Sequence, residues 1–147
     1  MKKEISICWI RRDLRLKDNA ALYHALKSGL PVVPIFIFDK NILGLLPDEK
    51  DRRVEFIYRA LEEMQSSLVA LNTTLDVHYG EPLAVFRNLL TTYSVQQVFT
   101  NHDYEAYARL RDADIEKLLL EYGAGYHHFK DQVIFETNSR VRNLSQF

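Results

Sequence analysis

Short apolar runs alternate along this chain with longer segments in which apolar residues recur at helical spacing, and this alternation constrains the fold more than any other feature. The short runs are rich in β-branched and aromatic residues, as buried strands are. Repeated strand–helix–strand units build a parallel sheet that is covered by helices. Five strands are expected, at residues 5–10, 32–38, 75–79, 97–101 and 125–130.

Four helices are expected between these strands. The first follows Asp18 as its N-cap and ends at Gly29, the second spans about residues 51–71, the third begins at Pro82, and the fourth spans about residues 107–122. Their spacing turns one side of each helix toward a core. The side chains expected to face inward include Leu22, Leu26, Tyr58, Leu61, Met64, Leu68, Phe86, Leu90, Ile115, Leu118, Leu119 and Tyr122.

The order of the strands follows from the handedness of the connections. Two right-handed halves that both start from the first strand place the second and fourth strands on either side of it. The sequence therefore predicts an α/β, Rossmann-like, doubly wound fold. Its five-stranded parallel sheet has the order 3-2-1-4-5, with helices on both faces.

Length and charge exclude several classes of protein. A chain of 147 residues fits one domain. Its 19 Lys and Arg against 20 Asp and Glu give a net charge of −1, so the chain lacks the overall excess of positive charge that is typical of a nucleic-acid binder. Cys8 is the only cysteine, so an internal disulfide is excluded. No stretch is long enough to span a bilayer, and the first residues lack a signal peptide's apolar region, so a cytoplasmic protein without a membrane partner is expected.

Sequence motifs for common active sites are missing. The glycine patterns that bind phosphate and the nucleophile elbow are not found, and the five histidines have no zinc spacing, so no metal is expected. No pair of carboxylates is placed as an acid–base couple, and no catalytic residue is nominated. His127 and His128 are expected to alternate across the last strand, one inward and one outward. In open parallel sheets ligands bind beyond the carboxyl ends of the strands, which leaves the loops there as candidates.

A basic run follows the first strand, with three arginines and a lysine between residues 11 and 17. One interpretation is structural: Arg11, Arg12 and Arg15 would pair with Asp13, Asp18 or carboxylates of a neighbouring loop and hold the turn in place. The other interpretation is a small basic surface for a ligand. The adjacent Asn19 is expected to be a capping residue.

The segment "WIRRDLRLKDNAAL" at residues 9–22 resembles the opening of the DNA photolyase/cryptochrome family. Two further segments agree in order and spacing: residues 32–57, from "VVPIFIFD" to "DRRVEFI", and residues 101–112, "NHDYEAYARLRD". The resemblance covers about residues 4–136. It implies that residues 1–136 form the amino-terminal α/β domain of such a protein. Residues 137–147 lie beyond this resemblance and have no apolar stripe of useful length, so a poorly ordered tail is expected there. On these terms the basic run is a structural signature of that domain.

The resemblance also implies a function. The amino-terminal domain of this family holds a light-harvesting antenna chromophore, either a deazaflavin or a folate, and passes its excitation to a flavin. In full-length relatives a larger helical domain follows, which holds FAD, binds damaged DNA and splits cyclobutane pyrimidine dimers. This chain is expected to lack that domain and to be inactive alone. Positions that match the family's chromophore contacts are Phe38, Asp39, Arg53, Asn101, Asp103 and Glu105.

Other functions remain open at this point. The parent could be a cryptochrome-type photosensor in place of a repair enzyme. A stand-alone nucleotide-binding domain of the universal-stress type has the same broad architecture and would bind an adenine nucleotide. A purely structural interaction domain would bind no small molecule.

Overall fold

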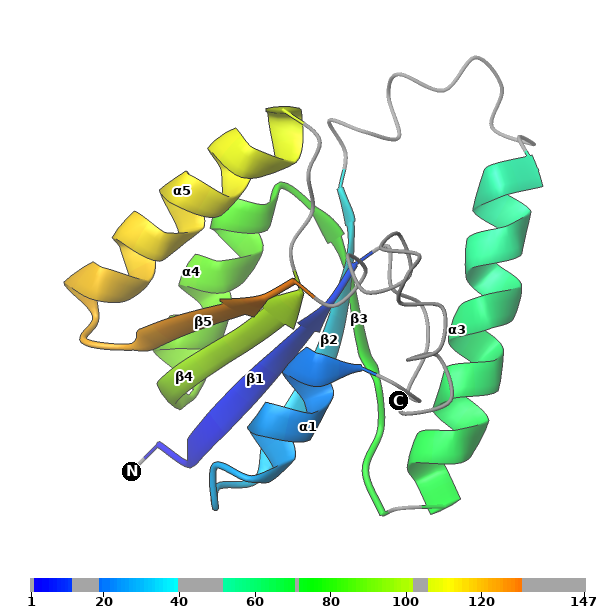
Figure 1. Cartoon of the computed structure of the whole chain (residues 1–147), viewed down its shortest axis with the longest axis horizontal. Coiled ribbons are helices and arrows are strands. Elements are labelled where there is room, and N and C mark those ends of the chain that lie inside the picture. The colour runs from blue at the N-terminus through cyan, green and yellow to red at the C-terminus, as the bar shows by residue number, and fades with distance from the viewer. Residues whose placement is uncertain (1, 12–18, 40–51, 71, 102–105, 131–147) are drawn as a thin grey trace, which may run out of the picture.

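The computed structural model describes residues 2–11, 19–39, 52–70, 72–101 and 106–130, without the side chains of residues 52–54, 106 and 107. The expected tail at residues 137–147 lies outside these ranges. The described chain forms one parallel sheet with the order β3-β2-β1-β4-β5, which confirms the predicted topology (Figure 1). The strands are β1 Glu4–Ile10, β2 Val32–Asp39, β3 Asp76–Gly80, β4 Ser94–Asn101 and β5 Gly125–Phe129.

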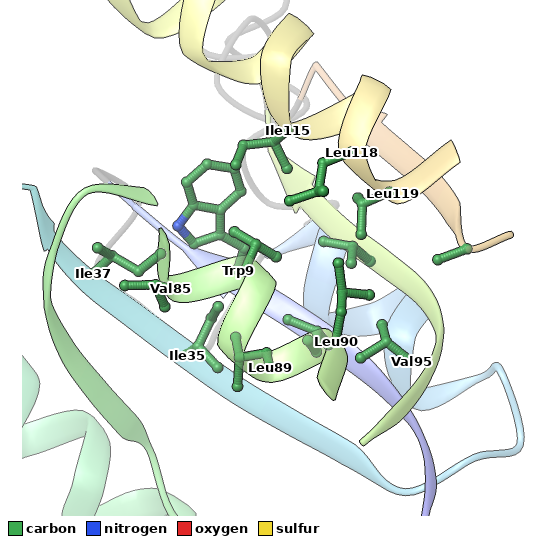
Figure 2. Close-up of a cluster of buried hydrophobic side chains, with 14 of the residues drawn as sticks. Trp9, Ile35, Ile37, Val85, Leu89, Leu90, Val95, Ile115, Leu118 and Leu119 are labelled. Atoms are coloured by element: carbon green, nitrogen blue, oxygen red, sulfur yellow. The ribbon is translucent and has the colours of Figure 1, made fainter. Parts of the chain in front are cut away.

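Helices cover both faces of the sheet, as the sequence predicts (Figure 1). On one face lie α1 (Ala20–Leu26) and α3 (Arg52–Ala70), and on the other lie α4 (Pro82–Thr92) and α5 (Ala106–Glu121). Each face has its own apolar core, because successive residues of a strand point to opposite sides. Trp9 belongs to the core under α4 and α5 (Figure 2), and its neighbour Cys8 belongs to the core under α1 and α3.

Strand β4 begins three residues before the predicted start at Gln97. Ser94 already pairs with Glu4, and Ser94 N donates to Lys3 O at 2.9 Å. The register then shifts by one residue, so that Ser6 pairs with Gln97 and an extra residue is accommodated in β4. The polar residues of this first part of β4 do not alternate in the usual way, and the sequence pattern therefore hides them.

Pro34 lies inside β2, although proline is rare within a central strand. Ser6 N donates to Pro31 O at 2.9 Å, and the alternation of a parallel ladder then directs the ring nitrogen of Pro34 away from β1. On that other side β3 joins the ladder only at Ile35. The missing N–H of Pro34 therefore leaves no hydrogen bond of the sheet unmade.

Several predicted details of the helices are wrong. The N-cap of α1 is not Asp18 but Asn19, which was itself expected to be a capping residue, because the Asn19 side chain accepts a hydrogen bond from Leu22 N. Helix α1 ends at Leu26, before the predicted end at Gly29. Gly29 lies in the turn that follows, with a φ of 87° at which a residue with a Cβ would be strained. The predicted inward positions Leu26, Tyr58 and Tyr122 are 61%, 46% and 51% exposed, respectively. Leu26 is the last residue of α1, and Tyr122 lies just beyond the end of α5.

The two adjacent histidines of β5 also differ from expectation. Their rings do alternate, since His127 stacks on Phe99 of the core under α1 and α3 and His128 lies beside Tyr126 on the opposite face. Both are exposed, however, so neither is the inward residue that was expected. Strand β5 is at the edge of the sheet, and none of its five residues is fully buried. Within the described residues no helix combines the length and the apolar character needed to cross a membrane.

Candidate functional site

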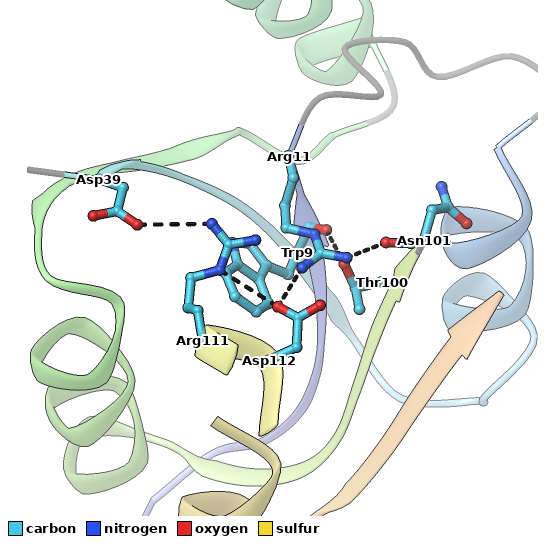
Figure 3. A network of polar contacts seen from close by, with 7 residues as sticks. All are labelled: Trp9, Arg11, Asp39, Thr100, Asn101, Arg111 and Asp112. Carbon is cyan, nitrogen blue, oxygen red and sulfur yellow. Dashed lines mark hydrogen bonds and ion pairs between the residues drawn. The ribbon is translucent and has the colours of Figure 1, made fainter. Parts of the chain in front are cut away.

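A buried polar network occupies the carboxyl edge of the sheet (Figure 3). Arg11 directly follows β1 and is 7% exposed. Its Nη1 contacts Asp112 Oδ1 on α5 at 2.5 Å, and its Nη2 donates to the backbone oxygen of Asn101 at the end of β4. One guanidinium therefore joins the ends of two strands to a helix, which is the geometry that a planar fork of donors favours.

A second guanidinium, that of Arg111, lies beside the first. It extends from α5 toward β2, with Nη1 at 3.7 Å from Asp39 Oδ2 and Nε at 3.4 Å from Asp112 Oδ1. Asp39 is only 5% exposed. Two arginines thus face two carboxylates in this network, and the opposite charges offset the loss of hydration that burial imposes on each group.

Trp9 lies at the centre of these charges. Its ring centroid is 4.8 Å from the guanidinium carbon of Arg11 and 5.0 Å from that of Arg111, within cation–π distance of both. The ring centroids of Trp9 and Phe86 are 5.0 Å apart in an edge-on arrangement. Thr100 Oγ1 donates to Trp9 O at 2.9 Å. With 1% exposure, the indole is a packed core element of this edge and has no open face for a ligand.

Tyr126 on β5 borders the same network. Burial raises the pKa of its phenol strongly, and the negative charge of Asp112 raises it further. Its buried hydroxyl makes no hydrogen bond within the described residues. The phenol of Tyr126 therefore stays neutral, because its surroundings disfavour the charged form.

Two asparagines fix the start of α1 against β4. Asn101 Nδ2 donates to Asn19 Oδ1 at 2.8 Å, and Asn101 Oδ1 accepts from Ala21 N at 3.1 Å. Asn19 Oδ1 also accepts from Leu22 N at 3.1 Å. The two amides satisfy donors of the first turn of α1 and hold that helix on the carboxyl end of the neighbouring strand.

Residues 6–145 match the family model described as DNA photolyase. The chain belongs to the DNA photolyase family. It is 34% identical over 151 residues to the deoxyribodipyrimidine photo-lyase of Vibrio cholerae and 32% identical over 146 residues to Cryptochrome-2 of Gallus gallus. Each alignment covers 96% of this chain, but 31% of the first relative and 23% of the second. The chain therefore spans less than a third of either relative.

A solved photolyase structure has the same fold. The archaeal photolyase from Sulfolobus tokodaii, described with two FAD molecules and the implication of a novel light-harvesting cofactor, superposes with a TM-score of 0.73 at 29% identity. The superposition covers 85% of this chain and 29% of that protein. The likeness agrees with the amino-terminal α/β placement that the sequence predicts.

The residues predicted from the family's chromophore contacts are only partly described. Phe38, Asp39 and Asn101 all lie at the carboxyl edge and are buried. Phe38 packs in the core under α1 and α3, whereas Asp39 contacts Arg111 on the α5 side, so the two side chains point to opposite faces of the sheet. The backbone of Arg53 is in the first turn of α3, without a described side chain, and Asp103 and Glu105 lie outside the described residues.

Other residues at this edge were not nominated from the sequence. Arg111 and Asp112 end the third family-like segment, so their motif was visible, but their pairing with Arg11 and Asp39 was not. Tyr58 and Tyr79 carry no motif at all. No group of three or more His, Cys, Asp or Glu residues in the described ranges is arranged to hold a metal ion.

Proposed function

We propose that this chain is the amino-terminal, chromophore-binding domain of a photolyase-like flavoprotein. The observation that carries the proposal is the family match over residues 6–145, together with a carboxyl edge at which polar and aromatic side chains meet. A planar light-absorbing group with polar edges fits such a set, because rings can stack on it while charged groups orient its edges. The bound group would supply absorption of near-ultraviolet or blue light.

The identity of the chromophore is a finer part of the proposal. A deazaflavin and a folate are the two candidates, and both are planar heteroaromatic groups. The proposed contacts are the predicted set Phe38, Asp39, Arg53, Asn101, Asp103 and Glu105. Among the described members, Asp39 and Asn101 make contacts within the chain, so we propose that they act by holding the strand ends that frame the ligand.

Direct titration of the purified 147-residue chain tests the proposal. Deazariboflavin and methenyltetrahydrofolate are each added while the fluorescence of Trp9, the only tryptophan, is followed. Both compounds absorb where tryptophan emits, so binding quenches this emission by energy transfer. Saturable quenching by either compound at micromolar concentration supports the proposal, and quenching by neither contradicts it.

An adenine nucleotide serves as the discriminating ligand. The alternative of a universal-stress-type domain requires ATP or AMP to bind to this fold. ATP does not absorb tryptophan emission, so calorimetry is used for this arm. Tight binding of ATP without binding of either chromophore would contradict the proposed chromophore-binding function.

The activity of a whole protein is proposed for a longer chain that contains this domain. We propose that FAD and damaged DNA bind there through a helical domain, that the reaction is light-driven splitting of pyrimidine dimers, and that the protein is cytoplasmic. A cryptochrome-type photosensor is the second candidate, because Cryptochrome-2 of Gallus gallus is also a relative. Loss of dimers from irradiated DNA under blue light, measured with the longer protein, separates repair from signalling, and the 147-residue chain alone should give none.

A further inference from the structure

A group of three aromatic side chains covers the carboxyl end of β2 and β3. Phe38 and Tyr79 are directly opposite each other in the β2–β3 ladder, and Tyr58 approaches them from α3. The ring centroids of Phe38 and Tyr79 are 4.8 Å apart at an interplanar angle of 18°. The centroids of Phe38 and Tyr58 are 5.0 Å apart at 32°. We call Phe38, Tyr58 and Tyr79 the aromatic shelf.

Exposure rises outward through the aromatic shelf. Phe38 is 3% exposed, whereas Tyr58 and Tyr79 are 46% and 57% exposed. Tyr79 is stacked on Phe38 with one face, and an exposure of 57% requires that much of its other face is open to solvent. The shelf therefore ends in a flat aromatic surface that is supported from below by a buried ring.

The two hydroxyl groups fix this surface in place. Tyr58 Oη and Tyr79 Oη are 3.1 Å apart, and this hydrogen bond raises the pKa of Tyr79. The phenol of Tyr79 is thus neutral, and its ring is held by a strand on one side and by a helix on the other. A ring that is already oriented loses little conformational entropy when a ligand stacks on it.

Phe38, the ring contact predicted from the family resemblance, is covered by these tyrosines. We infer that Tyr79 supplies the surface on which the planar ring system of the chromophore stacks, with Tyr58 as the residue that positions it. This inference rests on the proposed function, because it names a contact surface for the same ligand. Stacking of planar rings favours offset, near-parallel contacts, which is the arrangement that Phe38 and Tyr79 already have.

Other exposed tyrosines in the described ranges lack this combination. Tyr23 on α1 is 56% exposed, but Lys27 lies over its ring at 5.0 Å and donates to its hydroxyl. Tyr122 is 51% exposed and follows α5, where the helix has returned to the amino end of the strands. Tyr122 therefore offers a control of matched residue type and exposure at the opposite edge of the sheet.

The test compares three variants of the 147-residue chain in titrations with deazariboflavin and methenyltetrahydrofolate. Tyr79→Leu keeps apolar bulk but removes the ring, and it should weaken binding about tenfold, as expected for loss of one stacked aromatic contact. Tyr58→Phe keeps the ring and removes only the hydroxyl bond, and it should weaken binding about twofold to threefold. Tyr122→Leu should leave the affinity unchanged.

Induced circular dichroism in the chromophore band gives a readout that a purely structural role would not change. The bound chromophore should show this signal with the wild-type chain and with Tyr122→Leu, and lose most of it with Tyr79→Leu at saturating ligand. Thermal unfolding of all variants should agree closely, because Tyr79 is largely exposed. If the wild-type chain binds and Tyr79→Leu binds equally well with the same signal, the inference is wrong while the proposed function stands. If the wild-type chain binds neither compound, both are wrong.

Discussion

Trp9 and Tyr79 lie at the same edge of the sheet, but their surroundings differ in charge and in exposure. Trp9 is 1% exposed and has two guanidinium groups within 5.0 Å of its ring. Tyr79 is 57% exposed, and its described partners are the ring of Phe38 and the hydroxyl of Tyr58. Trp9 faces α4 and α5, whereas the aromatic shelf adjoins α3.

The difference separates groups that hold the edge together from groups that are available to a ligand. On the Trp9 side, arginines and carboxylates contact one another and connect β1, β2 and β4 to α5. On the shelf side, an open ring has stacking capacity that no described residue uses. We call the polar network of Arg11, Asp39, Arg111 and Asp112 around Trp9 the closed side, and the aromatic shelf the open side. Arg11 belongs to a motif of the sequence and lies on the closed side, whereas the tyrosines of the open side carry no motif.

The largest effect is expected from breaking the closed side. Arg11→Met keeps much of the side-chain length but removes the nearest cation of Asp112 and the guanidinium hydrogen bond to Asn101 O. Removing one partner of a buried pair typically destabilises by about 3–5 kcal/mol, and the partial exposure of Asp112 places this case near about 3 kcal/mol. Urea unfolding followed by Trp9 fluorescence measures the loss.

An exposed arginine gives the control for this change. Arg59 pairs with Glu55 at 2.7 Å on the outside of α3, with 74% and 60% of the two side chains exposed. Arg59→Met should change the free energy of unfolding by less than about 0.5 kcal/mol. Equal effects of the two substitutions would mean that Arg11 is not the structural anchor that its contacts indicate.

The second effect concerns the amide pair that holds the start of α1 on the end of β4. Asn101→Ala removes the acceptor of Ala21 N and the donor to Asn19, and it should lower stability by about 2 kcal/mol. Hydrogen exchange should accelerate first in α1, because that helix loses its anchor. Asn88→Ala, on the exposed side of α4, is the control and should have little effect. Unchanged exchange in α1 would instead leave a direct ligand contact as the better account of Asn101.

The strand order could be predicted because it depends on features that one sequence carries. Buried strands read as continuous apolar runs, and right-handed crossovers leave few topologies for five of them. The start of β4 could not be predicted, because the pairing of Ser94 with Glu4 comes from the sheet and not from local pattern. Leu26, Tyr58 and Tyr122 show the same limit: periodicity places them near an apolar stripe, and only packing decides which stripe residues are covered.

The site was less predictable for a related reason. The carboxyl edge and some of its residues follow from parallel strands and from a family-like pattern, and Phe38, Asp39 and Asn101 do lie there. Which of these are covered depends on contacts between distant segments, such as Arg11 with Asp112 and Phe38 with Tyr79. The latter pair becomes visible only when β2 and β3 are in register.

The third effect concerns Arg53, which lies in the first turn of α3. Arg53 matches a chromophore contact of the family, and its helix carries Tyr58 of the aromatic shelf. Arg53→Ala should weaken deazariboflavin binding about fivefold, as expected for loss of one charge-assisted hydrogen bond, with an unchanged unfolding midpoint. Arg52→Ala removes the same charge one residue earlier and is the matched control. A loss of stability with unaltered binding would assign Arg53 to the structure of the domain.

The smallest effect is expected for Tyr126, which lies beside the polar network around Trp9. Tyr126→Phe removes a buried hydroxyl that has no hydrogen-bond partner among the described residues. The substitution should stabilise the chain by about 0.5–1 kcal/mol at neutral pH, because an unsatisfied polar group no longer has to be buried. Tyr122→Phe, at an exposed tyrosine, should change stability little.

The same substitution has a pH dependence whose sign follows from the raised pKa of Tyr126. Above about pH 10 the phenol ionises in the unfolded chain but keeps its proton in the folded one. The unfolded state then binds fewer protons, so the stability of the wild-type chain falls as the pH rises through this range. Tyr126→Phe removes this contribution, and its advantage over the wild type should grow from pH 9 to pH 11, about one unit either side of the ordinary tyrosine pKa. A difference that stays constant over this range would mean that Tyr126 ionises equally in both states and that its hydroxyl is hydrated in solution.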